Sequence, residues 1–158
     1  MRKYKLTDET IQITRNGKEV ILHRIEALQD FADVKAGDKG GYVESEANLR
    51  HNGDCWIYGS AKVYDKAKVY DNAEVYGSAK VYDNAWIFGS AEVYGSAEVF
   101  GSAWIYGSAE VYDKAKVCDS AEVYDNAEVY GNAWIYGSAK VYDKANIYGC
   151  AKVGGTSK

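Results

Sequence analysis

The chain has 158 residues, a length that suits a single domain. Apolar residues make up 47% of the chain and charged residues 27%, and the net charge is −4, which excludes the basic surface of a nucleic-acid-binding protein. The first residues lack the apolar core of a signal peptide and no run reaches membrane-spanning length, so we expect a cytoplasmic protein with no membrane partner.

The first forty residues contain no repeat and predict a small cap. The segment 11–22, "IQITRNGKEVIL", alternates apolar and polar residues around Asn16-Gly17, a pair that favours a type I′ turn, and so predicts a β-hairpin. Residues 23–34 are expected to form a short turn or strand. We interpret 1–40 as a cap on the first coil of the structure that follows, whose backbone would otherwise be unpaired.

A short transition leads from this cap into a repeat. Val43, Ala47 and Leu49 are expected to begin the inward-facing pattern of the repeat. Eight residues separate Leu49 from Ile57, two more than the six-residue period that follows, which predicts a small bulge near 51–54.

The rest of the chain repeats every six residues. From Ala61 to Cys150 there are 15 hexads without a gap, and "CWIYGS" at 55–60 is a sixteenth with Cys55 in the alanine position. In the 15 hexads the first residue is always Ala, the third always Val or Ile, and the fifth always Gly or Asp. The fourth is Tyr or Phe except at Cys118. A fixed short period of this kind indicates a stacked-coil architecture.

Alternation within each hexad divides inward from outward residues. In A-x-V-Y the first and third side chains share one face of a strand, and the second and fourth share the other. Gly or Asp at the fifth position suits a corner, because both adopt left-handed backbone angles more readily than other residues. Ala and Val or Ile are therefore expected inside, and Tyr outside.

The pattern V-Y-D-N-A-E resembles the hexapeptide repeat of left-handed parallel β-helices, in which three hexads form one triangular coil. The segments "YKLTDET", "HRIEALQDFADVKAGDKGGYVESEANL" and "NGDCWIYGSAKV" resemble the YdcK-like proteins of bacteria and prophages. The resemblance implies an all-β fold: a single-stranded left-handed parallel β-helix of about six coils with an N-terminal hairpin cap. It also implies a homotrimer, and a bacterial or phage-infected cell as its setting. The expected division is 1–40 cap, 41–155 β-helix and 156–158 C-terminal tail.

Residues three hexads apart then stack about 4.8 Å from one another on three faces. The second hexad position on the first face reads Trp56, Glu74, Glu92, Glu110, Glu128, Asn146. On the second face it reads Lys62, Lys80, Glu98, Lys116, Trp134, Lys152. On the third face it reads Lys68, Trp86, Trp104, Glu122, Lys140. One face is thus acidic, one mostly basic, and one carries two adjacent tryptophans.

The third face supplies the candidate contact surface. Trp86, Phe88, Trp104 and Tyr106 form an aromatic patch of the kind that dominates protein interfaces. We expect it at a contact between subunits; a ladder without a partner, or a site for a small molecule with a flat ring, are the alternatives.

The acidic column of Glu74, Glu92, Glu110 and Glu128 has a plain explanation as a charged surface that keeps the protein soluble. The more specific interpretation is that this acidic column contacts a basic surface of a partner. No metal site is expected, since a calcium ion takes more oxygen ligands from converging loops. Cys55, Cys118 and Cys150 form no CxxC pair and are expected to be single thiols.

Catalytic residues are scarce. The acyltransferases that the repeat resembles use a histidine base, and this chain has two histidines. His23 lies in the cap, which leaves His51 as the only candidate base, with Asp54 as its orienting carboxylate. We therefore expect a non-catalytic oligomeric protein without a cofactor, which binds itself and a protein or small, nucleotide-like ligand at subunit grooves. A minimal acyltransferase with CoA-linked donors is the alternative.

Overall fold

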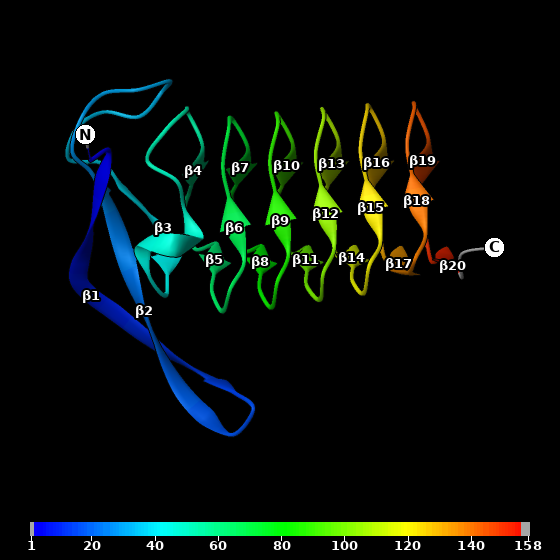
Figure 1. Ribbon diagram of the computed structural model, residues 1–158, viewed down its shortest axis with the longest axis horizontal. Coiled ribbons are helices and arrows are strands. Elements are labelled where there is room, and N and C mark those ends of the chain that lie inside the picture. The colour runs from blue at the N-terminus through cyan, green and yellow to red at the C-terminus, as the bar shows by residue number, and fades with distance from the viewer. Residues whose placement is uncertain (1, 156–158) are drawn as a thin grey trace.

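The computed structural model describes residues 2–155, which form a parallel β-solenoid of about six turns with a long hairpin at its N-terminal end (Figure 1). The solenoid agrees with the fold class predicted from the hexads, and the expected left-handed winding fits it. The predicted tail, 156–158, lies outside the described residues. Among residues 2–155 there is no helix that is long and apolar enough to cross a membrane.

Three parallel sheets form the walls of the solenoid, one for each face. The first face consists of β4 (Trp56–Ile57), β7 (Glu74–Val75), β10 (Glu92–Val93), β13 (Glu110–Val111), β16 (Glu128–Val129) and β19 (Asn146–Ile147). The second face consists of β5 (Lys62–Val63), β8 (Lys80–Val81), β11 (Glu98–Val99), β14 (Lys116–Val117), β17 (Trp134–Gly137) and β20 (Lys152–Gly155). The third face consists of β6 (Lys68–Val69), β9 (Trp86–Ile87), β12 (Trp104–Ile105), β15 (Glu122–Val123) and β18 (Lys140–Val141).

The register of these strands confirms the predicted stacks. Each strand within a face pairs with the strands three hexads before and after it, so that Glu92 lies between Glu74 and Glu110. In the same way Trp104 pairs with Trp86, and Lys62 with Lys80. The repeat length therefore fixes which side chains become neighbours on each face.

The interior is a narrow core of small and branched side chains, as the alternation predicts. Every Ala and every Val or Ile of the hexads from Ala61 to Val141 is at most 7% exposed. Because each coil contributes only these residues, the core is a continuous column rather than one central cluster.

The corners explain the alternation of Gly and Asp. All 16 corner residues from Gly59 to Gly149 have positive φ, seven of them aspartates with φ of 56–60°. An L-residue rarely adopts this conformation, but aspartate can bond locally to the backbone. The Asp83 carboxylate accepts a hydrogen bond from the Gly101 amide one coil away, at 3.0 Å, and Asp113 does the same for Gly131 at 3.1 Å. An aspartate corner thus ties its coil to the next.

The predicted hairpin is present and longer than the sequence indicated. It consists of β1 (Tyr4–Arg15) and β2 (Lys18–Ala27), joined by Asn16 and Gly17, both with the positive φ of a type I′ turn. β2 pairs antiparallel with β3 (Lys39–Val43), and β3 pairs parallel with β5. The hairpin therefore extends the sheet of the second face (Figure 1).

The transition segment corrects one predicted inward residue. Ala47 is exposed and lies in a 3-10 turn, η1 (Glu46–Asn48); its neighbour Asn48 is fully buried instead. The Asn48 side chain accepts from the Glu44 amide at 3.0 Å and donates to the Ala67 carbonyl at 2.8 Å. An amide replaces the alanine here because backbone groups at this irregular coil lack a partner in the repeat. The extra residues before Ile57 lie in bends at 51–54.

The cap also buries side chains that the repeat would place outside. Trp56, at the start of the first face, is 1% exposed, because the rings of Phe31 and Tyr4 pack edge-on against it with centroids 5.2 and 6.1 Å away. Tyr64 on the second face is 5% exposed, beside Arg15 of the hairpin. Trp56 is thus part of the core rather than the surface.

Candidate functional site

The two tryptophans of the third face lie side by side. Trp86 and Trp104 pair directly across β9 and β12, and their rings stack with centroids 5.2 Å apart and an interplanar angle of 1°. Phe88 and Tyr106 stack beside them at 4.8 Å and 4°, and Phe88 meets Trp104 edge-on at 6.0 Å. The four residues therefore form the single aromatic patch that the sequence predicted.

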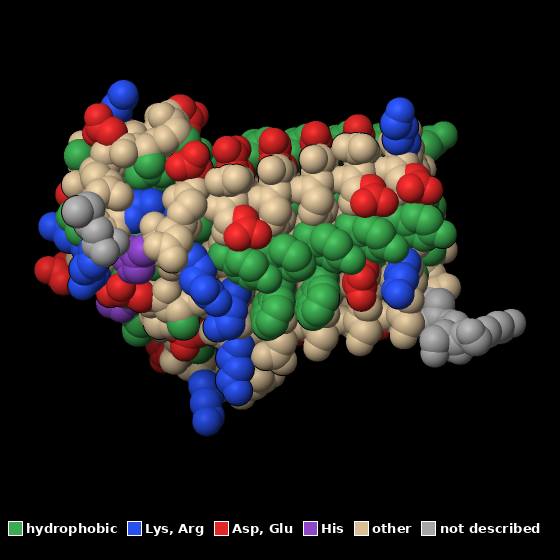
Figure 2. Space-filling model, turned by 45° about the horizontal axis from the view of Figure 1, so that its top comes forward, with side chains coloured by type: hydrophobic (Ala, Val, Ile, Leu, Met, Phe, Trp, Pro, Cys, Tyr) green, Lys and Arg blue, Asp and Glu red, His purple; other side chains and the backbone are tan. Residues whose placement is uncertain are grey.

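This patch is the middle of a longer apolar band. Trp104 is 37% exposed, and Tyr142 towards the C-terminal end of the same face is 48% exposed. Tyr70 stacks on Phe88 at 4.9 Å and Tyr124 on Tyr106 at the same distance, which extends the band over the face. Figure 2 shows this band of hydrophobic side chains along the solenoid. A surface of this extent is typical of a contact site.

A groove runs along the tryptophan side of the patch. It has a volume of about 640 Å³, and Lys66, Lys68, Asn84, Trp86 and Trp104 contribute to its lining. Among the described residues neither lysine forms an ion pair. The groove therefore combines two tryptophans and two lysines, and the lining also includes Asp65.

The acidic column differs from the free carboxylate surface that the sequence indicated. Glu92, Glu110 and Glu128 are half-buried, and each accepts a hydrogen bond from a tyrosine hydroxyl one coil earlier. The donors are Tyr76, Tyr94 and Tyr112, at 2.8, 2.7 and 2.9 Å. The same pairing occurs on the third face, where Tyr106 donates to Glu122, and burial together with this bond raises the pKa of Tyr106 to about 12.

The sequence contains a signal for these pairs that its analysis missed: each glutamate follows its tyrosine by 16 residues. Glu74, the first glutamate of the column, is the exception. The tyrosine at the equivalent position before it, Tyr58, donates instead to Asp33 of the cap at 3.0 Å.

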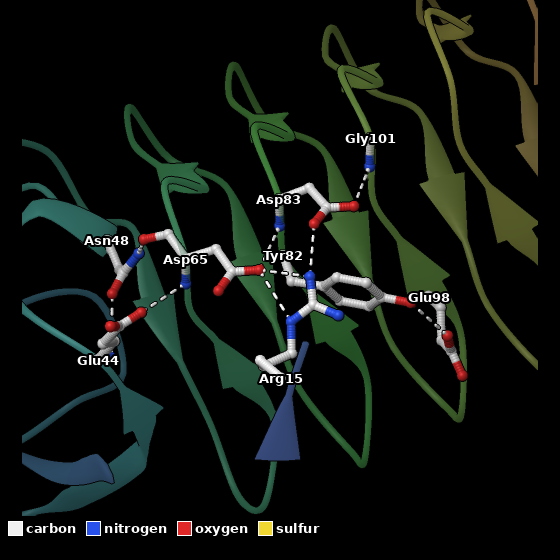
Figure 3. Close-up of polar contacts among 8 residues, drawn as sticks. All are labelled: Arg15, Glu44, Asn48, Asp65, Tyr82, Asp83, Glu98 and Gly101. Carbon is white, nitrogen blue, oxygen red and sulfur yellow. Dashed lines mark hydrogen bonds and ion pairs between the residues drawn. The ribbon is translucent and has the colours of Figure 1, made fainter. Parts of the chain in front are cut away.

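A charged cluster fixes the hairpin to the solenoid (Figure 3). The Arg15 guanidinium donates to the Asp65 carboxylate at 2.7 Å and to that of Asp83 at 2.6 Å. Its centre lies 4.8 Å from the ring centroid of Tyr82, and Glu44 accepts from the Asp65 amide at 2.8 Å. Both aspartates are corner residues one coil apart, so the hairpin tip bridges two coils. Sequence reasoning missed this cluster, because a lone arginine beside a turn gives no sign of its partners.

His51 is placed where both of its ring nitrogens have partners. Its Nδ1 accepts from the Lys3 amide at 3.0 Å, and its Nε2 lies 2.9 Å from a carboxylate oxygen of Glu46. The ring also stacks on Tyr4, with centroids 4.2 Å apart. The carboxylate that orients His51 is thus Glu46 and not Asp54, whose amide instead donates to Asn72. In this arrangement both ring nitrogens have partners within the protein.

The cysteines are single thiols, as predicted. Cys55 is fully buried, and its Sγ lies 3.5 Å from the Nζ of Lys3, itself 1% exposed. Burial raises the pKa of the Cys55 thiol and lowers the pKa of the Lys3 ammonium. Cys118 replaces an aromatic residue in the second-face column, and the indole nitrogen of Trp134 donates to it at 3.2 Å.

Comparison with known proteins gives one informative likeness. No protein-family model matches the chain. The chain is similar to the protein named "Uncharacterized acetyltransferase YdcK" of Escherichia coli strain K12, with 44% identity over 62 residues. The match covers 37% of this chain and 19% of that protein, so the chain corresponds to less than a fifth of its relative. This likeness and the solenoid confirm the resemblance to YdcK-like, hexapeptide-repeat proteins.

Proposed function

We propose that this protein is a non-catalytic, oligomeric binding protein whose third-face aromatic patch, formed by Trp86, Phe88, Trp104 and Tyr106, is its principal contact surface. The observation that carries the proposal is the stacked pair of a half-buried Trp86 and an exposed Trp104 within a continuous apolar band. Tryptophan and tyrosine at the centre of such a band are the residues whose burial contributes most to association.

The assembly that we propose is a homotrimer. The three faces carry different charges, so the third face of one copy can pack against an unlike face of the next, and such head-to-tail contacts close into rings. The number three comes from the resemblance to trimeric hexapeptide-repeat proteins. Grooves between subunits would then hold a second partner or a small ligand.

The groove beside Trp86 suits a planar anion of the nucleotide kind. Lys66 and Lys68 supply positive charge that no described carboxylate neutralises, while Asp65 at the same corner is already paired with Arg15. Indole rings stack on planar ligands with little dependence on their identity. A bacterial or phage setting for this role follows from the resemblance.

A pair of variants tests the contact surface. Trp86→Lys with Trp104→Lys places two charges in the proposed contact without touching the inward Ala and Val column. Tyr130→Lys with Tyr148→Lys makes the matched change on the first face, where these rings also stack one coil apart. Light scattering should show a smaller species for the tryptophan variant, with the circular dichroism of both variants unchanged. A smaller species for the tyrosine variant as well would identify the first face as the surface that the patch contacts. If both variants keep the wild-type mass, another surface holds the oligomer together.

Acetyl transfer is the second candidate, because the relative carries that activity in its name. Purified protein with acetyl-CoA and a panel of amines and sugars should release no free thiol above the background rate. A rate that disappears in His51→Ala would replace the non-catalytic proposal with the enzymatic one.

A further inference from the structure

The tyrosine ladder of the first face breaks at its first step. From Tyr76 through Tyr94 and Tyr112 to Tyr130 the rings stack in parallel, with centroids 4.6–5.0 Å apart and interplanar angles of 1–5°. Tyr58 and Tyr76 are instead nearly perpendicular, at 83°, with centroids 6.0 Å apart. These two rings therefore meet edge to face, at the point where the repeat meets the cap.

The break has an identifiable cause. The Tyr58 hydroxyl donates to the Asp33 carboxylate, which belongs to the segment between β2 and β3, and this bond turns its ring out of the ladder. Glu74 consequently lacks the tyrosine donor that the later glutamates of this face have. Within residues 2–155, no hydrogen bond or ion pair reaches the Glu74 carboxylate.

This carboxylate is in an unfavourable place for an unpaired negative charge. It is half-buried, and burial, followed by the neighbouring carboxylates of Glu92 and Asp33, raises the pKa of Glu74 above its ordinary value. Together with Asp33, Tyr58 and Tyr76 it lines a cavity of about 230 Å³. A cation that enters the cavity would gain attraction from two carboxylates and from the tyrosine rings that line it.

The lining favours an organic cation over a metal ion. A hard metal ion seeks six to eight oxygen ligands, and in the described part of the chain no group of three or more His, Cys, Asp or Glu residues lies close enough to hold one. The faces of tyrosine rings attract weakly hydrated ammonium groups, and aromatic corners with carboxylates bind methylated ammonium groups in particular. The geometry and the charge of the cavity therefore both favour a methylated ammonium group as the ligand.

We propose that Asp33, Tyr58, Glu74 and Tyr76 form a cage that binds the trimethylammonium group of a small molecule. The two perpendicular rings contact the methyl groups, and the carboxylates of Glu74 and Asp33 balance the positive charge. The cage residues belong to the first face and the cap, and none of them is part of the third-face patch proposed above.

Calorimetric titration with choline tests the cage, with 3,3-dimethylbutan-1-ol as a neutral ligand of the same shape. Choline should bind, and the neutral alcohol should bind at least about tenfold more weakly, because it loses both the cation–π and the carboxylate attraction. Nε-trimethyllysine is added as a second carrier of the group and should bind as choline does. Absence of choline binding, equal binding of the alcohol, or displacement of choline by equimolar calcium would each overturn the proposal.

Two matched variants assign the binding to this cavity. Glu74→Gln should weaken choline binding about tenfold. Glu128→Gln removes a carboxylate from the same hexad position of the same face, three coils away and outside the cavity, and should leave the affinity unchanged. Equal affinities of the two variants would show that choline binds elsewhere and that the cage assignment is wrong.

Discussion

The Arg15 cluster makes a quantitative prediction about how the hairpin is held. Arg15→Gln should lower the free energy of unfolding by about 2 kcal/mol. The guanidinium makes charge-assisted hydrogen bonds to two carboxylates, at 2.7 and 2.6 Å, and such bonds contribute about 1.5–3 kcal/mol when they are partly shielded from water. The side chains of Arg15 and Asp65 are 23% and 24% exposed, so solvent screening keeps the value near the lower end.

Arg2 provides the matched control for this substitution. It also lies 2.7 Å from a carboxylate, that of Glu46, but the two side chains are 57% and 43% exposed. Water screens this pair, so Arg2→Gln should change the free energy of unfolding by less than about 0.5 kcal/mol.

Urea unfolding at pH 7 in low salt measures both effects, and hydrogen exchange locates them. Arg15→Gln should also speed exchange in the outer parts of β1 and β2, whose contact with the solenoid it removes. The reasoning would be refuted if the two variants changed the free energy of unfolding by amounts that agree within about 0.5 kcal/mol. Burial would then make no difference to the stability that each ion pair contributes.

Three further predictions concern the solenoid. Ala103→Leu should lower the unfolding temperature, with a loss of about 1–3 kcal/mol in the free energy of unfolding, because Ala103 is fully buried in the narrow core. Ala151→Leu, at an exposed first hexad position, should have little effect. Equal shifts in unfolding temperature would mean that inward and outward positions are misassigned. Tyr94→Phe and Glu110→Ala should show a coupling of about 1 kcal/mol in a double-mutant cycle of urea unfolding, and additive effects would mean that their 2.7 Å hydrogen bond contributes nothing. Glu74→Gln should raise stability at pH 7. The pKa of Glu74 is raised from 4.5, so its ionised carboxylate lowers the stability of the fold at pH values above 4.5. The stability gained by the substitution should therefore disappear as the pH falls below 4.5. A gain in stability that persists at pH 3 would show that it does not come from the Glu74 charge.

The six-residue period is sufficient to predict most of the fold. It assigns Ala103 and Val111 to the interior and places Trp86 next to Trp104, because both follow from the alternation of a strand and from three hexads per coil. It also identifies the corners, since only Gly and Asp occur where φ is positive in the repeat. Each of these features depends on local geometry that every hexad repeats.

The parts that sequence could not predict involve contacts between the cap and the repeat. Nothing in the hexads indicates that Arg15 reaches Asp65 and Asp83, or that Tyr58 bonds to Asp33 rather than to Glu74. Such contacts depend on how a non-repetitive segment folds back over the first coils, and no periodicity describes it. The departures from the repeat pattern are therefore concentrated at the N-terminal end of the solenoid. The buried Trp56 and the paired His51 lie at this end as well.

The same limit applies to charge. Sequence reasoning treated Glu110 as one carboxylate of a charged surface that keeps the protein soluble. The structure places it half-buried, as the acceptor of the Tyr94 hydroxyl. The pairing spans 16 residues and joins two adjacent coils, so it becomes visible only when the columns of the second and fourth hexad positions are compared with each other.

The mass of the wild-type protein in solution tests the proposed function most directly. Light scattering at tens of micromolar should give three times the 17.5 kDa of one chain, because the apolar band around Trp86 and Trp104 would be covered by neighbouring copies. A mass of 17.5 kDa at that concentration would contradict the account, and the aromatic columns would then be ladders that stabilise a single solenoid.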